Sequence, residues 1–262
     1  MHVVITGASS GIGEALAREY LRRGASLTLV ARRRGKLEEL AKGHTDTCRV
    51  VEAALTDHEH ACDWVDAAAE ALGEIDVLVN TAGVQIVGRT VDTSVEDCER
   101  MLRLNILSPL RLTKHVLPGM IARGRGTIVD IASMAAIAPT PGMFYYNASK
   151  AALAAASESL RGELRGTGVH VMTVYPGPVR TAMEATGRAA YEETAMMKLF
   201  TPVGEAGVLA RKIANGVASG RARIIYPATY GVSRHFPNLT RFFLDRFTPP
   251  LKALPPPGGA KA

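Results

Sequence analysis

The chain alternates short apolar runs with longer segments in which apolar residues recur every three or four positions. The short runs are bounded by Gly, Asn or Asp, as is typical of buried β-strands. Runs of this kind occur at Val3–Thr6, Leu27–Ala31, Arg49–Ala53, Val77–Asn80, Thr127–Ile131, Val169–Tyr175 and Arg223–Tyr226. The pattern therefore predicts seven strands.

The segments of helical period lie between these runs. They occupy Ile12–Arg23, Gly35–Ala41, Glu59–Leu72, Val95–Ala122, Asn147–Arg165 and Glu205–Ala218. Strands that alternate with helices predict βαβ units, whose crossovers are right-handed. We therefore expect an α/β fold, a doubly wound sheet of seven parallel strands with helices on both faces and ligands at the carboxyl ends of the strands.

Length and composition favour one domain. The 262 residues, 47% hydrophobic and 21% charged, suffice for one sizeable core and are few for two full domains. We expect that domain over residues 1–248. Residues 249–262 hold five of the fourteen prolines and end in Gly-Gly-Ala-Lys-Ala, so we expect a poorly ordered tail there.

The net charge of +6 belongs to the C-terminal stretch. From Arg221 onward seven basic residues face one acid, Asp245, which leaves 24 of each sign in residues 1–220. A neutral main body argues against binding to nucleic acid. In the same basic stretch, apolar residues recur at near-helical spacing, at Phe236, Leu239, Phe243 and Phe247. Such a stripe covers a substrate cleft or a neighbouring subunit more often than it lies on a membrane surface.

Neither a metal site nor a disulfide framework is expected. The spacings of Cys48, Cys62 and Cys98 match neither pattern and suit a reduced cytoplasmic compartment. His58 and His60 lack a third ligand at suitable spacing, which favours a solvated helix face. The first strand begins at once, leaving no room for a signal peptide, and no apolar run is long enough for a membrane span. We expect a cytoplasmic protein with no transmembrane segment.

A glycine-rich turn follows the first predicted strand and leads into an amphipathic helix. It comprises Gly7, Ser9, Ser10, Gly11, Ile12 and Gly13, with the spacing Gly-x-x-x-Gly-x-Gly. Glycines let the backbone approach a pyrophosphate closely, and the helix N-terminus offers free N–H groups and partial positive charge. The turn predicts a dinucleotide site, although a glycine-rich turn can also be purely structural.

The end of the second predicted strand indicates which dinucleotide is bound. An acid about 20 residues beyond the glycines binds the ribose 2′-hydroxyl of NAD, whereas an arginine accommodates the 2′-phosphate of NADP. Arg32 and Arg33 stand there, and no carboxylate occurs before Glu38. Because a guanidinium pairs with phosphate, we expect NADP(H) in preference to NAD(H); the alternative is an exposed basic cap after the strand.

Tyr146 and Lys150 lie four residues apart, and so on one helix face, while Ser133 follows the preceding strand. Hydride transfer to or from a carbonyl carbon requires a proton transfer at its oxygen. The ordinary pKa of a tyrosine is near 10, and a neighbouring ammonium together with the positive nicotinamide should lower it. Tyr146 is therefore the expected general acid/base. Tyr145 is five residues from Lys150 and is assigned to packing or the substrate pocket.

Together these motifs resemble the short-chain dehydrogenase/reductase family from Thr6 to about Tyr226. Four further motifs recur in family order, namely Asn80-Thr81-Ala82-Gly83, Asn105, Ser133 and Pro176-Gly177-Pro178-Val179-Arg180-Thr181. The resemblance implies a Rossmann-type fold and an NADP(H)-dependent oxidoreductase that interconverts a ketone or aldehyde and an alcohol. The alternative is a non-catalytic NADP(H)-sensing or scaffold protein, which has no need of the serine and tyrosine.

The resemblance also implies residue roles. Lys150 would bind the nicotinamide ribose, Ser133 the substrate oxygen, and Asn105 a water of the proton relay. The nicotinamide carboxamide would bind the Val179 backbone and the Thr181 hydroxyl, in a loop that includes Pro176 and Gly177. The adenosine side would be lined by Asn80, Ala82 and Gly83. Two departures are Ala54, where relatives carry an acid that binds adenine, and Thr81, where asparagine is usual.

The substrate and the oligomer are less closely specified. Relatives place a mobile substrate lid at about residues 182–200, where Met183, Met196, Met197, Leu199 and Phe200 suit an apolar pocket. The alanine-rich run Ala151–Ala156 lies on a helix that commonly forms a subunit contact in the family. The resemblance therefore implies a small-molecule carbonyl or alcohol substrate and a homodimer or homotetramer.

Overall fold

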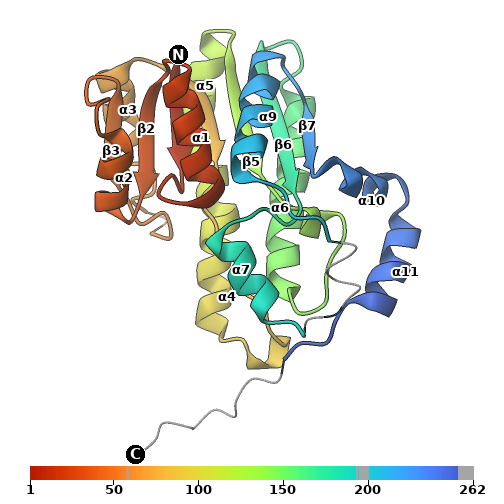
Figure 1. Ribbon diagram of the computed structural model, residues 1–262. Helices are drawn as coiled ribbons and strands as arrows, with labels where there is room; N and C mark the ends of the chain where they lie inside the picture. The colour runs from red at the N-terminus through yellow and green to blue at the C-terminus, as the bar shows by residue number, and fades with distance from the viewer. Residues whose placement is uncertain (58, 193, 195–200, 253–262) are drawn as a thin grey trace, which may run out of the picture.

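A computed structural model describes residues 1–57, 59–192, 194 and 201–252 of the chain. Its centre is a sheet of seven strands in the order β3-β2-β1-β4-β5-β6-β7 (Figure 1). The strands are His2–Thr6, Ser26–Ala31, Cys48–Glu52, Ile75–Asn80, Gly126–Ile131, Val169–Pro176 and Arg223–Tyr226, numbered β1 to β7. Every neighbouring pair is parallel, so the predicted doubly wound, Rossmann-type sheet is confirmed.

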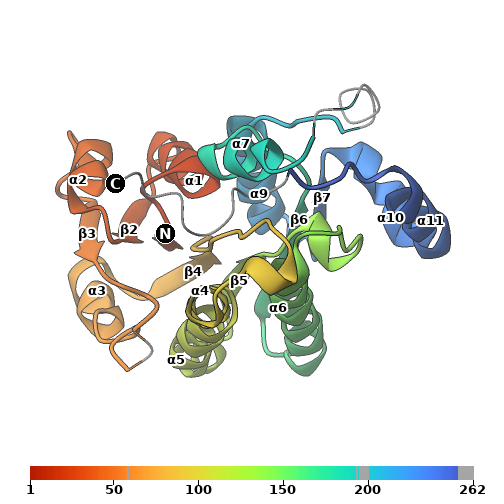
Figure 2. The same cartoon turned by 90° about the horizontal axis from the view of Figure 1, so that it is seen from below.

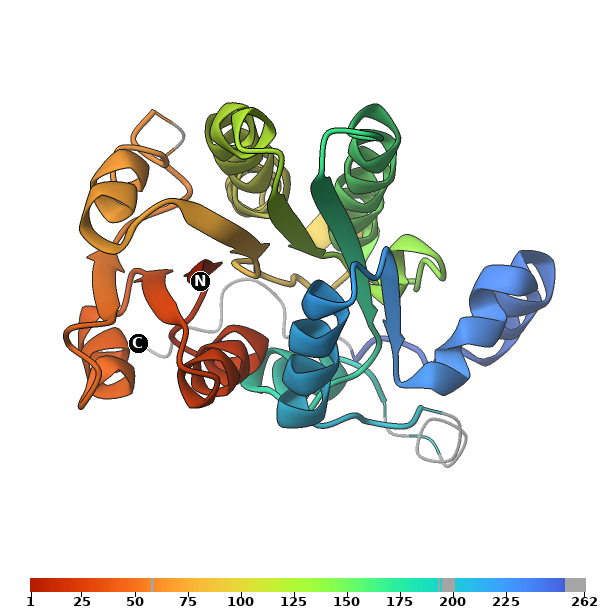
Figure 3. The same cartoon turned by 90° about the horizontal axis from the view of Figure 1, so that it is seen from above.

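Helices cover both faces of this sheet (Figure 3). One face carries α1 (Gly11–Arg22), α2 (Arg34–Ala41) and α9 (Ala206–Ala218). The other face carries α3 (Val65–Leu72), α5 (Ser108–Ala122) and α6 (Phe144–Glu163). Alternate strand residues serve the two layers: Val3 and Ile5 pack under α1, whereas Val4 packs on the opposite side. This alternation explains why the strands are apolar at nearly every position.

The long helix predicted over Val95–Ala122 is interrupted. The structure has α4 (Val95–Leu102), a π-helical turn at Arg103–Leu107, and then α5. A π turn inserts an extra residue per turn and occurs mostly at functional sites, but no local residue preference announces it. The helix predicted from Glu59 begins only at Val65.

At the carboxyl ends of the strands lie short helices and turns, most of which the sequence periodicity did not predict. Figure 2, which looks at these ends, shows α7 (Ala182–Ala189) on the side of α1 and α9, and α4 on the side of α5 and α6. Short 3-10 turns at Thr90–Asp92, Met134–Ala136 and Ala228–Gly231 complete the described helical elements. Beyond β7, α10 (Val232–His235) and α11 (Pro237–Phe247) project from the edge of the sheet (Figures 1 and 3).

The first residues of the predicted tail contact the body of the protein. Pro249 to Lys252 are held by the body of the protein: the N–H of Glu192 donates to the carbonyl of Pro250, and the N–H of Lys252 to that of Ala190, at 3.0 and 2.9 Å. These backbone bonds join segments that lie far apart in the sequence, which is why composition alone suggested a loose tail. Residues 253–262 lie outside the described part of the chain.

No helix in the described residues is long and apolar enough to cross a membrane.

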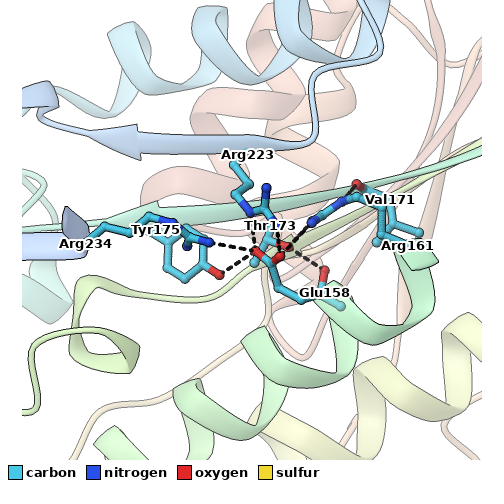
Figure 4. Close-up of polar contacts among 8 residues, drawn as sticks. Glu158, Arg161, Val171, Thr173, Tyr175, Arg223 and Arg234 are labelled. Carbon is cyan, nitrogen blue, oxygen red and sulfur yellow. Dashed lines mark hydrogen bonds and ion pairs between the residues drawn. The ribbon is translucent and has the colours of Figure 1, made fainter. Parts of the chain in front are cut away.

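One carboxylate ties α6 to β6, β7 and α10 (Figure 4). Glu158 accepts hydrogen bonds from the Tyr175 hydroxyl at 3.0 Å and from Arg161 at 2.8 Å. It also pairs with Arg223 at the start of β7 and, at 3.9 Å, with Arg234 of α10. These donors, Arg223 foremost, lower the pKa of Glu158 to about 2. The carboxylate therefore stays ionised at any pH near neutrality.

We expect Glu158→Gln to destabilise the protein at neutral pH by roughly 1–3 kcal/mol, because three guanidinium groups lose their counter-charge. The contribution of a carboxylate with a lowered pKa is complete above its ordinary value, here 4.5, and is lost as the pH falls toward about 2. The difference in unfolding free energy between wild type and variant should therefore shrink over that interval. Denaturant titrations at several pH values measure it, with the exposed Glu39→Gln as control, and a difference independent of pH would contradict the prediction.

Candidate active site

The site lies where the direction of strand order reverses, between β1 and β4. Ligands of doubly wound sheets bind at this position. The Thr6 hydroxyl at the end of β1 accepts hydrogen bonds from the N–H groups of Thr81 and Ala82, both at 3.1 Å. The structure thereby brings the glycine-rich turn and the turn after β4 together, as the sequence predicted for a common site.

The glycine-rich turn packs so closely against neighbouring backbone that a side chain at Gly7 or Gly13 would clash. Gly7 has φ +68°, and a Cβ added there would come within 2.8 Å of the Ala82 Cα. A Cβ on Gly13 would lie 2.4 Å from the Gly7 carbonyl oxygen, so α1 packs directly against the turn. Gly11 has φ +60°. These glycines are structural, and the tight turn they allow starts α1 at Gly11 and Ile12 with no side-chain cap from Ser10. N–H groups at this helix start are available to an anion.

Arg33 reaches across to the glycine-rich turn. Its guanidinium donates to the hydroxyl oxygens of Ser9 and Ser10, at 2.9 and 2.7 Å, and to the Ser9 carbonyl at 3.2 Å. Arg32 beside it is exposed. The Arg33 guanidinium and two serine hydroxyls thus gather beside the end of β2, a donor set suited to a phosphate.

Tyr146 and Lys150 lie in the first two turns of α6, and both are buried, at 8% and 5% exposure. The ammonium of Lys150 donates to the Ile131 carbonyl at 2.8 Å and lies 6.0 Å from the centre of the Tyr146 ring. Ser133 follows β5 and caps a 3-10 turn by accepting from the Ala135 N–H at 3.1 Å. The fold therefore assembles these three predicted residues in one place.

Burial sets the proton affinities of this pair. It raises the pKa of the Tyr146 phenol, and the hydrogen bond with Ser133 opposes that rise only in part. The expected lowering, which joined Lys150 to the positive nicotinamide, stays a prediction for the complex with the oxidised cofactor. Burial also lowers the pKa of Lys150 to about 8, while the negative charge of Asp130 opposes the decrease. The phenol is neutral and the lysine is poised near physiological pH.

Asn105 lies in the π turn and is fully buried. Its amide nitrogen donates to the Val84 carbonyl at 2.9 Å and to the Ser149 hydroxyl at 3.1 Å, and its oxygen accepts from the Val84 N–H at 3.0 Å. The added Cβ of Gly83 would lie 3.1 Å from the Asn105 oxygen and 3.5 Å from the Lys150 nitrogen. Asn105 and Lys150 therefore border the same narrow space beside Gly83.

A buried polar pair behind this space was missed by sequence reasoning. Asn80 donates to the Asp130 carboxyl at 2.8 Å and to the Thr113 hydroxyl at 3.3 Å. Burial raises the pKa of Asp130, although Asn80 and Ser157 oppose the rise. The sequence did contain a signal for this pair, because Asp130 is a charged residue within the otherwise apolar run of β5. The Asn80 side-chain oxygen and the Thr81 hydroxyl are buried without a partner in the structure.

The loop after β6 reaches back to the glycine-rich turn. Pro176 pairs in register with Tyr226, and Gly177 packs so closely on Tyr230 that an added Cβ would lie 2.8 Å from its ring. Val179 is buried, and Thr181 caps α7 by accepting from the Glu184 N–H at 3.2 Å. The added Cβ of Gly11 would lie 3.2 Å from the Thr181 methyl group. Residues from the two predicted cofactor loops are therefore in contact.

An apolar wall surrounds Tyr146. It is formed by Met101, Ala135, Val84, Ile86, Met143 and Tyr145. Tyr145 lies edge-on to Phe144, with ring centres 5.0 Å apart, so it contributes to this wall. Of the predicted lid, Met183 lies on α7 and is 41% exposed, whereas Met196, Met197, Leu199 and Phe200 lie outside the described residues.

The residues present fit a dinucleotide. The glycines leave no side chain over the start of α1, and Arg33 with its serines offers phosphate ligands. The Ala54 position, where an adenine ligand was missing from the sequence, is exposed and carries no acid. No group of three or more His, Cys, Asp or Glu side chains suitable for a metal ion occurs in the described part of the chain, from which His58 is excluded.

Comparison with known proteins assigns the class. A family model described as short chain dehydrogenase matches residues 1–192. An uncharacterized oxidoreductase of Staphylococcus epidermidis is 38% identical over 180 residues, which cover 69% of this chain and 78% of the relative.

Solved structures agree over nearly the whole chain. A short-chain dehydrogenase from Streptomyces avermitilis has a TM-score of 0.80 and 29% identity, and the match covers 93% of this chain and 94% of that one. A short-chain dehydrogenase from Sphingobium yanoikuyae in complex with NADPH has a TM-score of 0.78 and 30% identity, with 97% and 98% covered. The protein therefore belongs to the short-chain dehydrogenase family, a class of oxidoreductases.

We expect Lys150→Met to alter the pH dependence of stability in the cofactor-free protein. Since burial lowers the Lys150 pKa from 10.5 to about 8, protonation opposes folding below about 8 and ceases to do so above 10.5. The stability of the wild type relative to the variant should rise over that interval by on the order of 3 kcal/mol. Denaturant titrations measure the change, with the exposed Lys114→Met as control. Parallel pH profiles for wild type and Lys150→Met would show that the buried amine is not desolvated.

Proposed function

We propose that the protein is an NADP(H)-dependent oxidoreductase that interconverts a ketone or aldehyde and an alcohol, with Tyr146 as general acid/base. The observation that carries this proposal is the set of Asn105, Ser133, Tyr146 and Lys150, which three separate elements bring to one place beside the glycine-rich turn. NADP(H) supplies or accepts the hydride when bound. A pure binding protein would need neither the tyrosine nor the serine.

Side chains of the protein supply the proton transfer and the binding of the substrate oxygen. The neutral Tyr146 phenol is ready to donate its proton to a carbonyl oxygen that Ser133 holds. Lys150, with its pKa of about 8, stands beside the ring and can return a proton. Asn105 borders the same space through Gly83 and is placed to hold a water there. The apolar wall around Tyr146 excludes bulk water and favours a substrate with an apolar body.

The preference for NADP(H) rests on Arg32 and Arg33. A carboxylate at this place would repel a 2′-phosphate, whereas the Arg33 guanidinium already organises the Ser9 and Ser10 hydroxyls at short range. The Sphingobium relative, 30% identical, is solved with NADPH.

We also infer a homodimer or homotetramer in the cytoplasm. Leu107, Leu110 and Ile121 are 46%, 40% and 42% exposed along the π turn and α5, beside a groove that α5 forms with α6. Apolar side chains in such a row favour a subunit contact. The described cysteines are free thiols, which supports a reducing compartment.

We expect Tyr146→Phe to lower kcat/KM for carbonyl reduction by roughly 10²–10⁴-fold, because the general acid is lost. The assay follows loss of the nicotinamide absorbance of NADPH with a panel of ketones and aldehydes. Tyr145→Phe is the matched control and should retain most activity. Undiminished turnover in Tyr146→Phe would refute the assignment, and NADPH binding without turnover of any carbonyl by the wild type would favour the scaffold alternative.

We expect replacement of both Arg32 and Arg33 by Ala to weaken NADPH binding roughly 10- to 100-fold more than NADH binding, because only NADPH carries the 2′-phosphate. Fluorescence titration of each cofactor gives the two dissociation constants. Arg34→Ala serves as control, since it removes the adjacent arginine, which pairs with Glu38. Equal losses for both cofactors would mean that the arginines only brace the turn.

A further inference from the structure

The C-terminal helix α11 turns its apolar face away from the protein. Five large side chains of this helix and its N-cap, which we call the aromatic face, are 39–61% exposed, namely Phe236, Leu239, Phe242, Phe243 and Phe247. No residue of α11 is buried. A helix of a soluble protein directs its apolar stripe inward. The sequence left open whether this stripe covers the substrate cleft, and its exposure shows that it does not.

The face that α11 turns toward the body is mostly polar. Arg241 donates to the Pro139 carbonyl at 2.8 Å and pairs with Asp245. Thr240 and Leu244 are half-buried on the same side. The hydrogen bond from Arg241 to Pro139 therefore joins the opposite face to the body and leaves the aromatic face outward.

The short helix α10, which leads into α11, contacts the body of the protein. Its Arg234 pairs with Glu158 at 3.9 Å and lies over the Tyr175 ring, with the guanidinium carbon 5.8 Å from the ring centre (Figure 4). The exposed rings also pack on one another, since Phe242 and Phe243 meet edge-on at 5.8 Å and Phe243 stacks on Phe247 at 5.7 Å. An ordered apolar surface that projects from the molecule is typical of a binding surface (Figure 1).

Charge indicates what covers this surface. Arg246 emerges within the aromatic face, its guanidinium 5.7 Å from the centre of the Phe247 ring. From Arg221 onward seven basic residues accompany one acid, Asp245. Of these, Arg241 pairs with Asp245, and Arg223 and Arg234 pair with Glu158 of α6, so Arg246 is the arginine that the aromatic face itself presents. A contact between two copies through this face would bring arginine near arginine across a two-fold axis, at an electrostatic cost. Anionic lipid headgroups would instead complement the charge.

We propose that α10 and α11 form a peripheral membrane-binding element, in which the aromatic face enters the boundary between headgroups and acyl chains of an anionic bilayer. Arg246 pairs with a lipid phosphate while its stem lies along the apolar layer. A single short helix of this kind binds reversibly, so the protein exchanges between membrane and solution. The proposal does not depend on the hydride-transfer function.

The test is flotation of the full chain with vesicles of phosphatidylcholine alone and of equal parts phosphatidylcholine and phosphatidylglycerol. The wild type should float with the anionic vesicles and bind the neutral ones several-fold less, and added salt should weaken the anionic binding. This comparison uses the wild-type protein alone, so it does not depend on the folding of a variant. Equal binding to both vesicles, or binding to neither, overturns the proposal.

Two variants locate the contact. The double variant Phe242→Ser and Phe243→Ser should lose most vesicle binding, at least about tenfold, and Arg246→Glu should lose binding to anionic vesicles specifically. Val91→Ser, at a site 85% exposed outside α11, is the matched control and should bind like the wild type. Circular dichroism and thermal unfolding verify that each variant is folded.

Light scattering separates the membrane from a second copy of the chain. The Phe242/Phe243 variant should keep the mass of the wild type in solution. If that variant instead changes the mass and leaves vesicle binding unaltered, the aromatic face is a contact between copies and the proposal is wrong.

Discussion

The amide of Asn105 connects three parts of the site that the sheet alone does not align. It pairs with both backbone groups of Val84 after β4 and with Ser149 on α6, next to Lys150. This is possible only because the π turn between α4 and α5 rotates the side chain inward. The loop after β4 and the helix that carries Tyr146 therefore hold a common position through one buried side chain. Ser133, from β5, then faces the same phenol.

Burial gives these residues their chemical character. Water is excluded from Tyr146 and Lys150, so both prefer their neutral forms more than they would in solution. The lysine pKa of about 8 results from two opposed effects, desolvation and the Asp130 charge. Asp130 itself is buried and held by Asn80, whose backbone belongs to the turn on the cofactor side. The turn after β4 and the buried pair Tyr146 and Lys150 are thus linked electrostatically as well as sterically.

Much of this could be predicted from the sequence, for identifiable reasons. The strands could be predicted because buried parallel strands are short apolar runs. The motif residues could be predicted because their spacing along the chain is read directly from the sequence and does not depend on tertiary packing. The π turn at Arg103–Leu107 could not be found, since its residues continue a helical pattern. The raised pKa of Tyr146 was missed because spacing reveals a neighbouring charge and not the depth of burial. Helical periodicity also identified the aromatic face, but it could not show whether that face points toward the body of the protein or toward solvent.

The last described residues contact the loop before α6 and the segment after α7. Leu251 lies against Gly142, where an added Cβ would come within 2.8 Å of its side chain, and pairs as an isolated bridge with Tyr191. The Tyr191 hydroxyl in turn donates to the Pro141 carbonyl at 2.7 Å. Tyr191, directly after α7, therefore joins the loop before α6 to the chain that returns from α11. These three segments, far apart in the sequence, are held in one position by contacts that include a single tyrosine side chain.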